Sequence, residues 1–132
     1  SGTSWDVAKG WDNLNKKWLT YRNGYASTLT TINNQMGVWL HLTNSDGILT
    51  TGVTGDYSGS AVEIQLYTGW NMVGYPSATP SLGSTIANAD VVSVWQIASP
   101  YVSDEAPGDV TMSEDNAYWV HVTANTLWTV NP

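Results

Sequence analysis

The chain has 132 residues and a net charge of −7, and its cationic side chains are Lys9, Lys16, Lys17 and Arg22. This length suits one domain, and so few cations argue against nucleic acid as a partner, because phosphate binding requires clustered Lys and Arg. The absence of cysteine excludes disulfides and thiolate-bound zinc. No apolar run approaches the roughly 20 residues that a membrane helix needs.

Short β-prone runs, separated by Asn, Gly and Pro, predict an all-β fold. The domain is expected to be an antiparallel β-sandwich or a flattened barrel, with strands over residues 18–21, 37–43, 48–51, 61–67, 69–75, 91–98, 117–123 and 126–130. Asn23-Gly24 is a hairpin signal, and a polar loop is expected through Pro107-Gly108. One or two helical turns are predicted over residues 82–89 with Ser81 as N-cap, and a weaker candidate covers residues 12–17.

One strand phrase occurs twice, 80 residues apart: Val38-Trp39-Leu40-His41-Leu42-Thr43 and Tyr118-Trp119-Val120-His121-Val122-Thr123. Both copies alternate, with Trp, His and Thr on one face, and a period of two is typical of a strand. Upstream, Trp5-Asp6-Val7-Ala8 is similar to Trp95-Gln96-Ile97-Ala98, 90 residues away, so the first copy carries about ten extra residues. This duplication predicts one domain over residues 1–132 with an internal two-fold repeat, its halves covering about 4–55 and 61–130.

The second half also carries longer phrases: Gly69-Trp70-Asn71-Met72-Val73-Gly74-Tyr75-Pro76-Ser77, Val94-Trp95, Ala117-Tyr118-Trp119-Val120-His121-Val122 and Leu127-Trp128-Thr129-Val130. These resemble the "GWNLVGYP … GYWIYV … LTV" all-β repeat domains appended to secreted and cell-surface proteins of archaea and some bacteria. The resemblance implies an extracellular or cell-surface accessory module, and it carries over no catalytic residue. The first copy departs from the family pattern because it lacks the GWN strand, of which Gly10-Trp11-Asp12-Asn13 is a faint echo.

No arrangement of residues predicts catalysis, so the expected function is a non-catalytic accessory or adhesion module, with a glycan or another surface protein as partner. A purely structural spacer is the alternative, and a small secreted glycan-active enzyme is a third candidate. No cofactor is expected. Two glycosidase carboxylates should lie about 5–10 Å apart across a cleft, whereas most carboxylates here fall in predicted loops.

Two groups of residues suggest metal binding, and each has a structural alternative. His41 and His121 are either a pair of ligands or sugar-contacting groups, or imidazoles covered by another sheet and satisfied by a hydrogen bond. A tight transition-metal site normally needs three or four ligands, which favours the second interpretation. The acidic stretch from Asp104 to Asp115 suggests calcium, although its spacing matches no known calcium loop and a solvated loop is the simpler interpretation.

Aromatic side chains are the best candidates for ligand binding. Trp11 follows a glycine and precedes Asp12-Asn13, so a loop position is expected, with the indole either stacking on a sugar or plugging the end of the β-structure. The predicted site has Trp11 as platform, flanked by Trp18 and Tyr21, with hydrogen bonds from Asn13 and Arg22. It lies in the ten-residue excess of the first copy. Trp70 and Trp119 are expected to anchor the core, and core packing is also favoured for Trp18.

Overall fold

The computed structural model describes residues 5–43, 59–95, 102–114 and 116–132, with Trp95 described by its backbone alone. The described chain is all-β, apart from two short 3₁₀ helices, η1 (Gly83–Thr85) and η2 (Pro107–Asp109). Its strands are β1 (Trp5–Asp12), β2 (Lys17–Arg22), β3 (Val38–Leu42), β4 (Val62–Leu66), β5 (Gly69–Gly74), β6 (Ser81–Leu82), β7 (Ala89–Trp95), β8 (Val102–Glu105), β9 (Thr111–Met112), β10 (Ala117–Val122) and β11 (Thr126–Val130).

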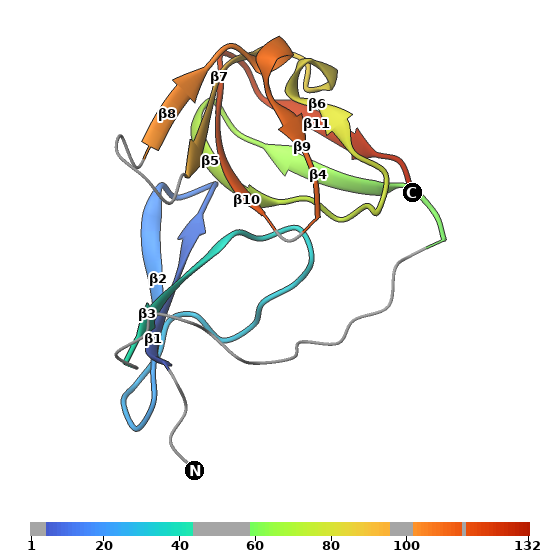
Figure 1. The fold of residues 1–132 in the computed structure, drawn as a ribbon. Coiled ribbons are helices and arrows are strands. Elements are labelled where there is room, and N and C mark those ends of the chain that lie inside the picture. The colour runs from blue at the N-terminus through green and yellow to red at the C-terminus, as the bar shows by residue number, and fades with distance from the viewer. Residues whose placement is uncertain (1–4, 44–58, 96–101, 115) are drawn as a thin grey trace.

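All strand pairs in the described chain are antiparallel. An N-terminal sheet has the order β2-β1-β3, and the largest sheet has the order β5-β10-β7-β8 (Figure 1). Two smaller sheets pair β11 with β4 and β6 with β9. None of these sheets closes on itself among the described strands, so the barrel alternative is not formed there.

The two larger sheets share an arrangement around their central strands. β1 lies between β2 and β3, and β7 lies between β8 and β10. His41 lies opposite Val7, and His121 lies opposite Val91. This register matches Asp6-Val7-Ala8 with Asp90-Val91-Val92 and places Trp11, rather than Trp5, at the position of Trp95. The register therefore favours Trp11 over Trp5 as the counterpart of Trp95, and so disfavours a ten-residue excess in the first copy. Residues 96–98 of the predicted match lie outside the described residues.

The hydrophobic core lies entirely in the C-terminal region of the described chain. Its cluster of buried side chains begins at Ile64 and ends at Val130, and it includes the inward-facing residues of β10. Those residues are Tyr118, Val120 and Val122, as the alternation of this strand predicts. Trp128 is 2% exposed and packs near Tyr75, so Trp128 is a buried core tryptophan. Trp70, by contrast, is 37% exposed, and the prediction that Trp70 anchors the core is wrong.

Most predicted strands are confirmed, but residues 48–51, and residues 96–98 of the strand predicted over 91–98, lie outside the described residues. β1 and β8 were not among the predicted strands, and each forms by pairing with a neighbouring strand. Residues 82–89 contain only the single turn η1, capped by Leu82 rather than Ser81. Asn23-Gly24 does form a turn, closed by the amide of Tyr25 on the Arg22 carbonyl, but no hairpin strand follows it.

Candidate functional site

The N-terminal sheet is attached to the largest sheet along the outer edge of β5. Residues Trp70, Met72 and Gly74 alternate along that edge, and each is bonded by the N-terminal region. The Asn13 amide clasps Met72, accepting from its N–H at 2.8 Å and donating to its C=O at 3.3 Å. The Gly74 N–H donates to the Gln35 carbonyl at 2.9 Å. These bonds satisfy an open sheet edge that would otherwise expose unpaired backbone groups.

Gly74 permits this close approach because it has no side chain. A Cβ at this position would lie 2.8 Å from the Met36 carbonyl oxygen and 2.9 Å from that of Asn34. Both are backbone atoms, so the N-terminal segment would have to move away. Gly74, which begins the Gly74-Tyr75-Pro76-Ser77 part of the phrase, therefore allows the two regions to pack closely.

The turn between β1 and β2 supplies one further contact to β5 and one to Tyr67, which precedes β5. The Asp12 carboxylate accepts from the amides of Leu14 and Asn15, which folds residues 12–17 into a tight turn instead of the predicted helix. Lys16, at a φ of 53°, donates from Nζ to the Trp70 carbonyl at 2.7 Å and to the Tyr67 carbonyl at 3.2 Å. Burial lowers the pKa of this ammonium, although the charge of Asp12 opposes the shift.

Three indoles meet where the two regions join, and we name Trp11, Trp18 and Trp119 the tryptophan triangle. Their ring centroids lie 5.1 Å apart for Trp11–Trp18, 5.4 Å for Trp11–Trp119 and 5.7 Å for Trp18–Trp119. All three pairs are edge-to-face, a favoured geometry of aromatic rings. Trp11 also donates its Nε1–H to the Trp70 carbonyl at 3.3 Å. The triangle is therefore held by both β1–β2 and β10.

Trp18 is the exposed member of the triangle. Its side chain is 44% exposed, whereas Trp11 and Trp119 are half-buried. Trp11 lies within β1 rather than on a loop, so the loop prediction is wrong, and the core interpretation of Trp18 is wrong as well. An indole that packs against two other rings while nearly half of its surface faces solvent is a candidate for ligand contact.

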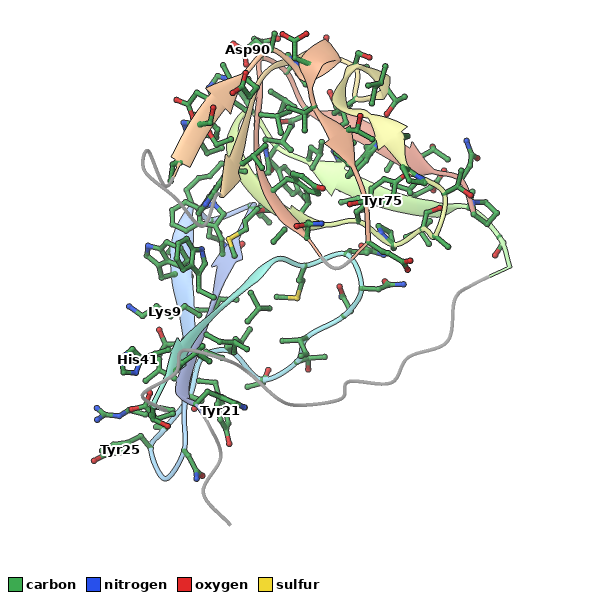
Figure 2. All side chains as sticks on the ribbon, viewed as in Figure 1. Lys9, Tyr21, Tyr25, His41, Tyr75 and Asp90 are labelled. Carbon is green, nitrogen blue, oxygen red and sulfur yellow. The ribbon has the colours of Figure 1, made fainter. Side chains whose placement is uncertain are left out.

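The other predicted site residues are not gathered around the triangle. Asn13 is engaged with Met72. Tyr21 follows Trp18 by three positions in β2, so the two side chains leave opposite faces of the strand, and the Tyr21 ring lies 6.0 Å from that of Trp5. The Arg22 guanidinium lies 4.6 Å from the centre of the Tyr25 ring. Figure 2 shows Tyr21 and Tyr25 near the end of the N-terminal sheet farthest from Asp90.

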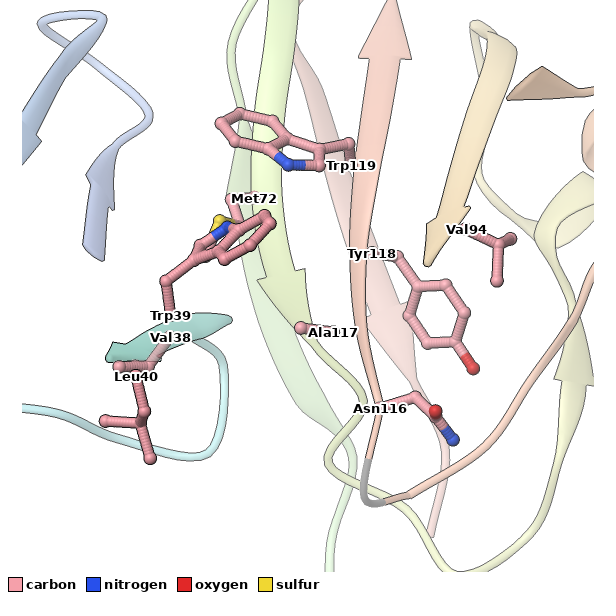
Figure 3. A pocket seen from close by; sticks show the side chains of 9 residues that line it. All are labelled: Val38, Trp39, Leu40, Met72, Val94, Asn116, Ala117, Tyr118 and Trp119. Carbon is pink, nitrogen blue, oxygen red and sulfur yellow. The ribbon is translucent and has the colours of Figure 1, made fainter. Parts of the chain in front are cut away.

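A cavity of about 310 Å³ adjoins the triangle and lies between the two copies of the repeated phrase. Its lining comes from Val38, Trp39 and Leu40 on β3, from Met72 and Val94, and from Asn116, Ala117, Tyr118 and Trp119 beside and within β10. Figure 3 shows the Trp39 and Trp119 rings on the side of Met72, with Tyr118 directed to the other side of β10. Its volume lies at the low end of the range for small-molecule sites, roughly 300–1,000 Å³.

The two histidines each bond a carboxylate, and this pairing was not predicted. His41 Nδ1 lies 2.6 Å from Asp6 Oδ1, and His121 Nδ1 lies 2.6 Å from Asp90 Oδ1. In both sheets the register shifts at the aspartate, so a β-bulge turns its carboxylate toward the histidine. An Asp-Val pair near the start of each central strand, Asp6-Val7 in β1 and Asp90-Val91 in β7, was the available signal. Figure 2 places Asp90 at the top of the C-terminal region and His41 far below it on the N-terminal sheet, so the two histidine–aspartate pairs do not form one site.

The acidic stretch does not converge on a cation site within the described residues. Asp104 and Glu105 are neighbours on β8 and bond Ser93 and Ser103, respectively. Asp115 lies outside the described residues. Where side chains are described, no group of three or more His, Cys, Asp or Glu comes close enough to hold a metal ion.

Comparison with protein-family models, curated proteins and solved structures finds no match to this chain. Among the described residues, no helix has the length and apolar character needed to span a membrane.

Proposed function

We propose that this chain is a non-catalytic accessory or adhesion module that contacts glycans at the cell surface or outside the cell. The observation that carries the proposal is Trp18, which stays 44% exposed while its ring is fixed by two other indoles. Sugar rings present flat C–H faces that stack on indoles, and a pre-fixed ring loses little conformational entropy on binding. The family resemblance of the GWN–GYPS phrase supports the extracellular setting.

We also propose that the fold is a sandwich with an internal two-fold repeat. The matching neighbours of β1 and β7, the repeated strand phrase and the two bulged aspartates support this. Under this proposal, β5 has no counterpart beside β3 among the described strands. The repeat explains why the binding surface forms at a junction, because each copy contributes tryptophans to the same triangle.

The alternative function is a structural spacer, and the edge contacts of β5 favour it specifically. Asn13, Lys16 and Gln35 fix the N-terminal sheet on β5, which would suit a rigid spacer that binds nothing. The two functions differ in one respect: a spacer has no use for a half-exposed Trp18.

A glycan array probed with the parent chain and with Trp18→Ala tests this proposal. The parent is expected to bind at least one glycan class, and Trp18→Ala is expected to lose that signal while remaining folded. Losing edge-to-face contacts should cost about 0.5–1.5 kcal/mol for each ring pair, less than the stability of a typical domain of about 5–15 kcal/mol.

Tyr25→Ala is the matched control, because Tyr25 is also an exposed aromatic but lies on the turn after β2, away from the triangle. This variant should bind as the parent does. Equal loss in both variants would indicate non-specific contact through exposed rings. A parent chain that binds no glycan on the array would favour the spacer.

A further inference from the structure

A second exposed indole lies beyond the triangle on the largest sheet. Trp70 on β5 lies opposite His121 on β10, and their ring centroids are 5.2 Å apart in an edge-to-face arrangement. The Trp70 side chain is 37% exposed, although its carbonyl is held by both Lys16 and Trp11. Trp70 therefore combines a fixed backbone with an accessible ring, as Trp18 does.

The Asp90 carboxylate fixes the orientation of the His121 ring beside Trp70. An ionised carboxylate only accepts hydrogen bonds, so Nδ1 carries the proton in this pair and Nε2 is left to bond a ligand hydroxyl. The β-bulge at Asp90 is what brings the carboxylate to the imidazole. In the N-terminal sheet, Asp6 and His41 form the same pair, but β3 has no outer neighbour among the described strands, so no strand there corresponds to β5 with its Trp70.

Trp70 and His121 are continuous with the triangle. Trp119 and His121 are two residues apart on β10, so both side chains leave the same face of the sheet. We name Trp18, Trp119, His121 and Trp70 the aromatic row. At the two ends of the row, the ring centroids of Trp18 and Trp119 lie 5.7 Å apart, and those of His121 and Trp70 lie 5.2 Å apart. With two residues of strand between them, the path along the row amounts to roughly 17 Å, several times the width of one ring.

We propose that the aromatic row is one binding surface for a linear, uncharged, β-linked glycan, with Trp18 and Trp70 as its outer stacking platforms. This inference rests on the proposed function and adds the class of ligand. A single sugar ring would cover only one platform, whereas an extended chain can reach both. In β-1,4-linked chains of glucose or N-acetylglucosamine, all ring substituents are equatorial, which leaves both ring faces free for stacking.

Charge argues against an anionic glycan. The chain carries a net charge of −7. Two carboxylates lie beside the row: Asp90 bonds His121, and Asp104 bonds Ser93, which lies opposite Trp119. Lys16, the cation nearest Trp70, already donates to two backbone carbonyls. The carboxylates can accept from sugar hydroxyls but would repel uronate or sulfate groups.

The test is calorimetric titration of the parent, Trp18→Ala and Trp70→Ala with cello-oligosaccharides and chito-oligosaccharides from the disaccharide to the hexasaccharide. For the parent, affinity is expected to rise with length. For Trp70→Ala, disaccharide affinity should stay within about twofold of the parent, and hexasaccharide affinity should fall by about tenfold, because stacking on one ring contributes roughly that factor. Leu127→Ala is the control, since Leu127 is exposed on β11 of another sheet.

The outcomes separate the two proposals. If Trp18→Ala abolishes binding but Trp70→Ala keeps the length dependence of the parent, the row is refuted and the glycan function stands. If the parent binds none of these oligosaccharides, the row is refuted for its stated ligand class, and the glycan array decides the general function. If Trp70→Ala does not fold, indole N–H signals of the parent replace it: the Trp70 signal should shift with the hexasaccharide and not with the disaccharide.

Discussion

The N-terminal and C-terminal regions have similar strand arrangements but differ in how much apolar surface they bury. Between Ile64 and Val130 the strands enclose a full hydrophobic core, whereas between residues 5 and 43 the buried hydrophobic side chains of the described chain are Ala8 and Leu29. At matched register positions, Val120 is 0% exposed and Leu40 is 36% exposed. The same alternating phrase thus builds a core in one sheet and leaves an accessible surface in the other.

The difference follows from what holds each region in place. Apolar burial stabilises the C-terminal region, and its contribution scales with the area removed from water. The N-terminal sheet is held largely by polar contacts to the edge of β5 and by the tryptophan triangle. A region fixed by its edge can leave side chains accessible on both faces of its sheet: Leu40 and Tyr21 are exposed on one face, and Trp18 is exposed on the other.

Trp128→Ala should have the largest effect, because it empties a core position that is 2% exposed. Truncating a buried Trp costs about 3–5 kcal/mol, so the melting temperature should fall sharply or the protein should not fold. Trp70→Ala is the comparison, and its melting temperature should stay near that of the parent. Thermal unfolding by circular dichroism measures both, and similar losses in the two variants would contradict the assignment of the core.

Val120→Ala and Leu40→Ala compare matched positions in the two regions. Val120→Ala should cost about 2 kcal/mol or more, since buried methylenes contribute roughly 0.8 kcal/mol each and a cavity remains. Leu40→Ala removes a larger side chain but should cost less than about 1 kcal/mol, because Leu40 is partly solvated. Urea unfolding gives both values. The reverse order would mean that the N-terminal sheet buries its apolar face as fully as the C-terminal one.

Asn13→Ala tests the attachment of the N-terminal sheet. It removes both bonds to Met72 and leaves the backbone groups of a buried residue unsatisfied, which should cost about 1–3 kcal/mol. Asn15→Ala is the control in the same turn, because the Asn15 amide bonds only Asp12 there, and its cost should be smaller. Equal unfolding free energies for the two variants would indicate that the Asn13 clasp contributes nothing.

The smallest effect concerns the exposed pair of the N-terminal sheet. A hydrogen bond from His41 lowers the pKa of Asp6 below its ordinary value of 3.8. Because the folded-state pKa is the lower one, this bond stabilises the fold above pH 3.8, and that contribution is lost as the pH falls through the folded-state pKa. Carboxyl-detected NMR titration should find this shift in the parent and its reduction in His41→Gln. Titration of Asp6 at or above its ordinary value would refute the pairing.

Much of the fold was predictable from periodicity, because the alternation of apolar and polar residues identifies a strand and the face that it buries. The alternation of residues 117–122 correctly placed Tyr118, Val120 and Val122 in the core. β8 carries polar Ser103, Asp104 and Glu105, and pairing with β7 decides its conformation, which a local pattern cannot reveal. Trp70 and Trp128 show the same limit: both lie in strands, but only the stacking of elements determines which ring is covered.

The candidate site was predictable only in part. Trp11 and Trp18 were identified, and the structure brings them together. Their third partner, Trp119, lies about a hundred residues away and was assigned to the core, because sequence alone does not show which face of β10 meets the β1–β2 hairpin. Asn13 was expected to bond sugar hydroxyls, but it bonds the backbone of Met72 on the edge of β5. No local sequence pattern predicts this contact.

We propose that the junction of the two regions keeps Trp18 packed against two indoles, exposed to solvent and able to contact a glycan. The most direct measurement follows the indole Nε1–H signals of the parent by NMR while the glycan that binds best on the array is added. The Trp18 signal should shift in proportion to occupancy, and the signal of buried Trp128 should not move. A bound glycan that leaves the Trp18 signal in place would contradict the claim.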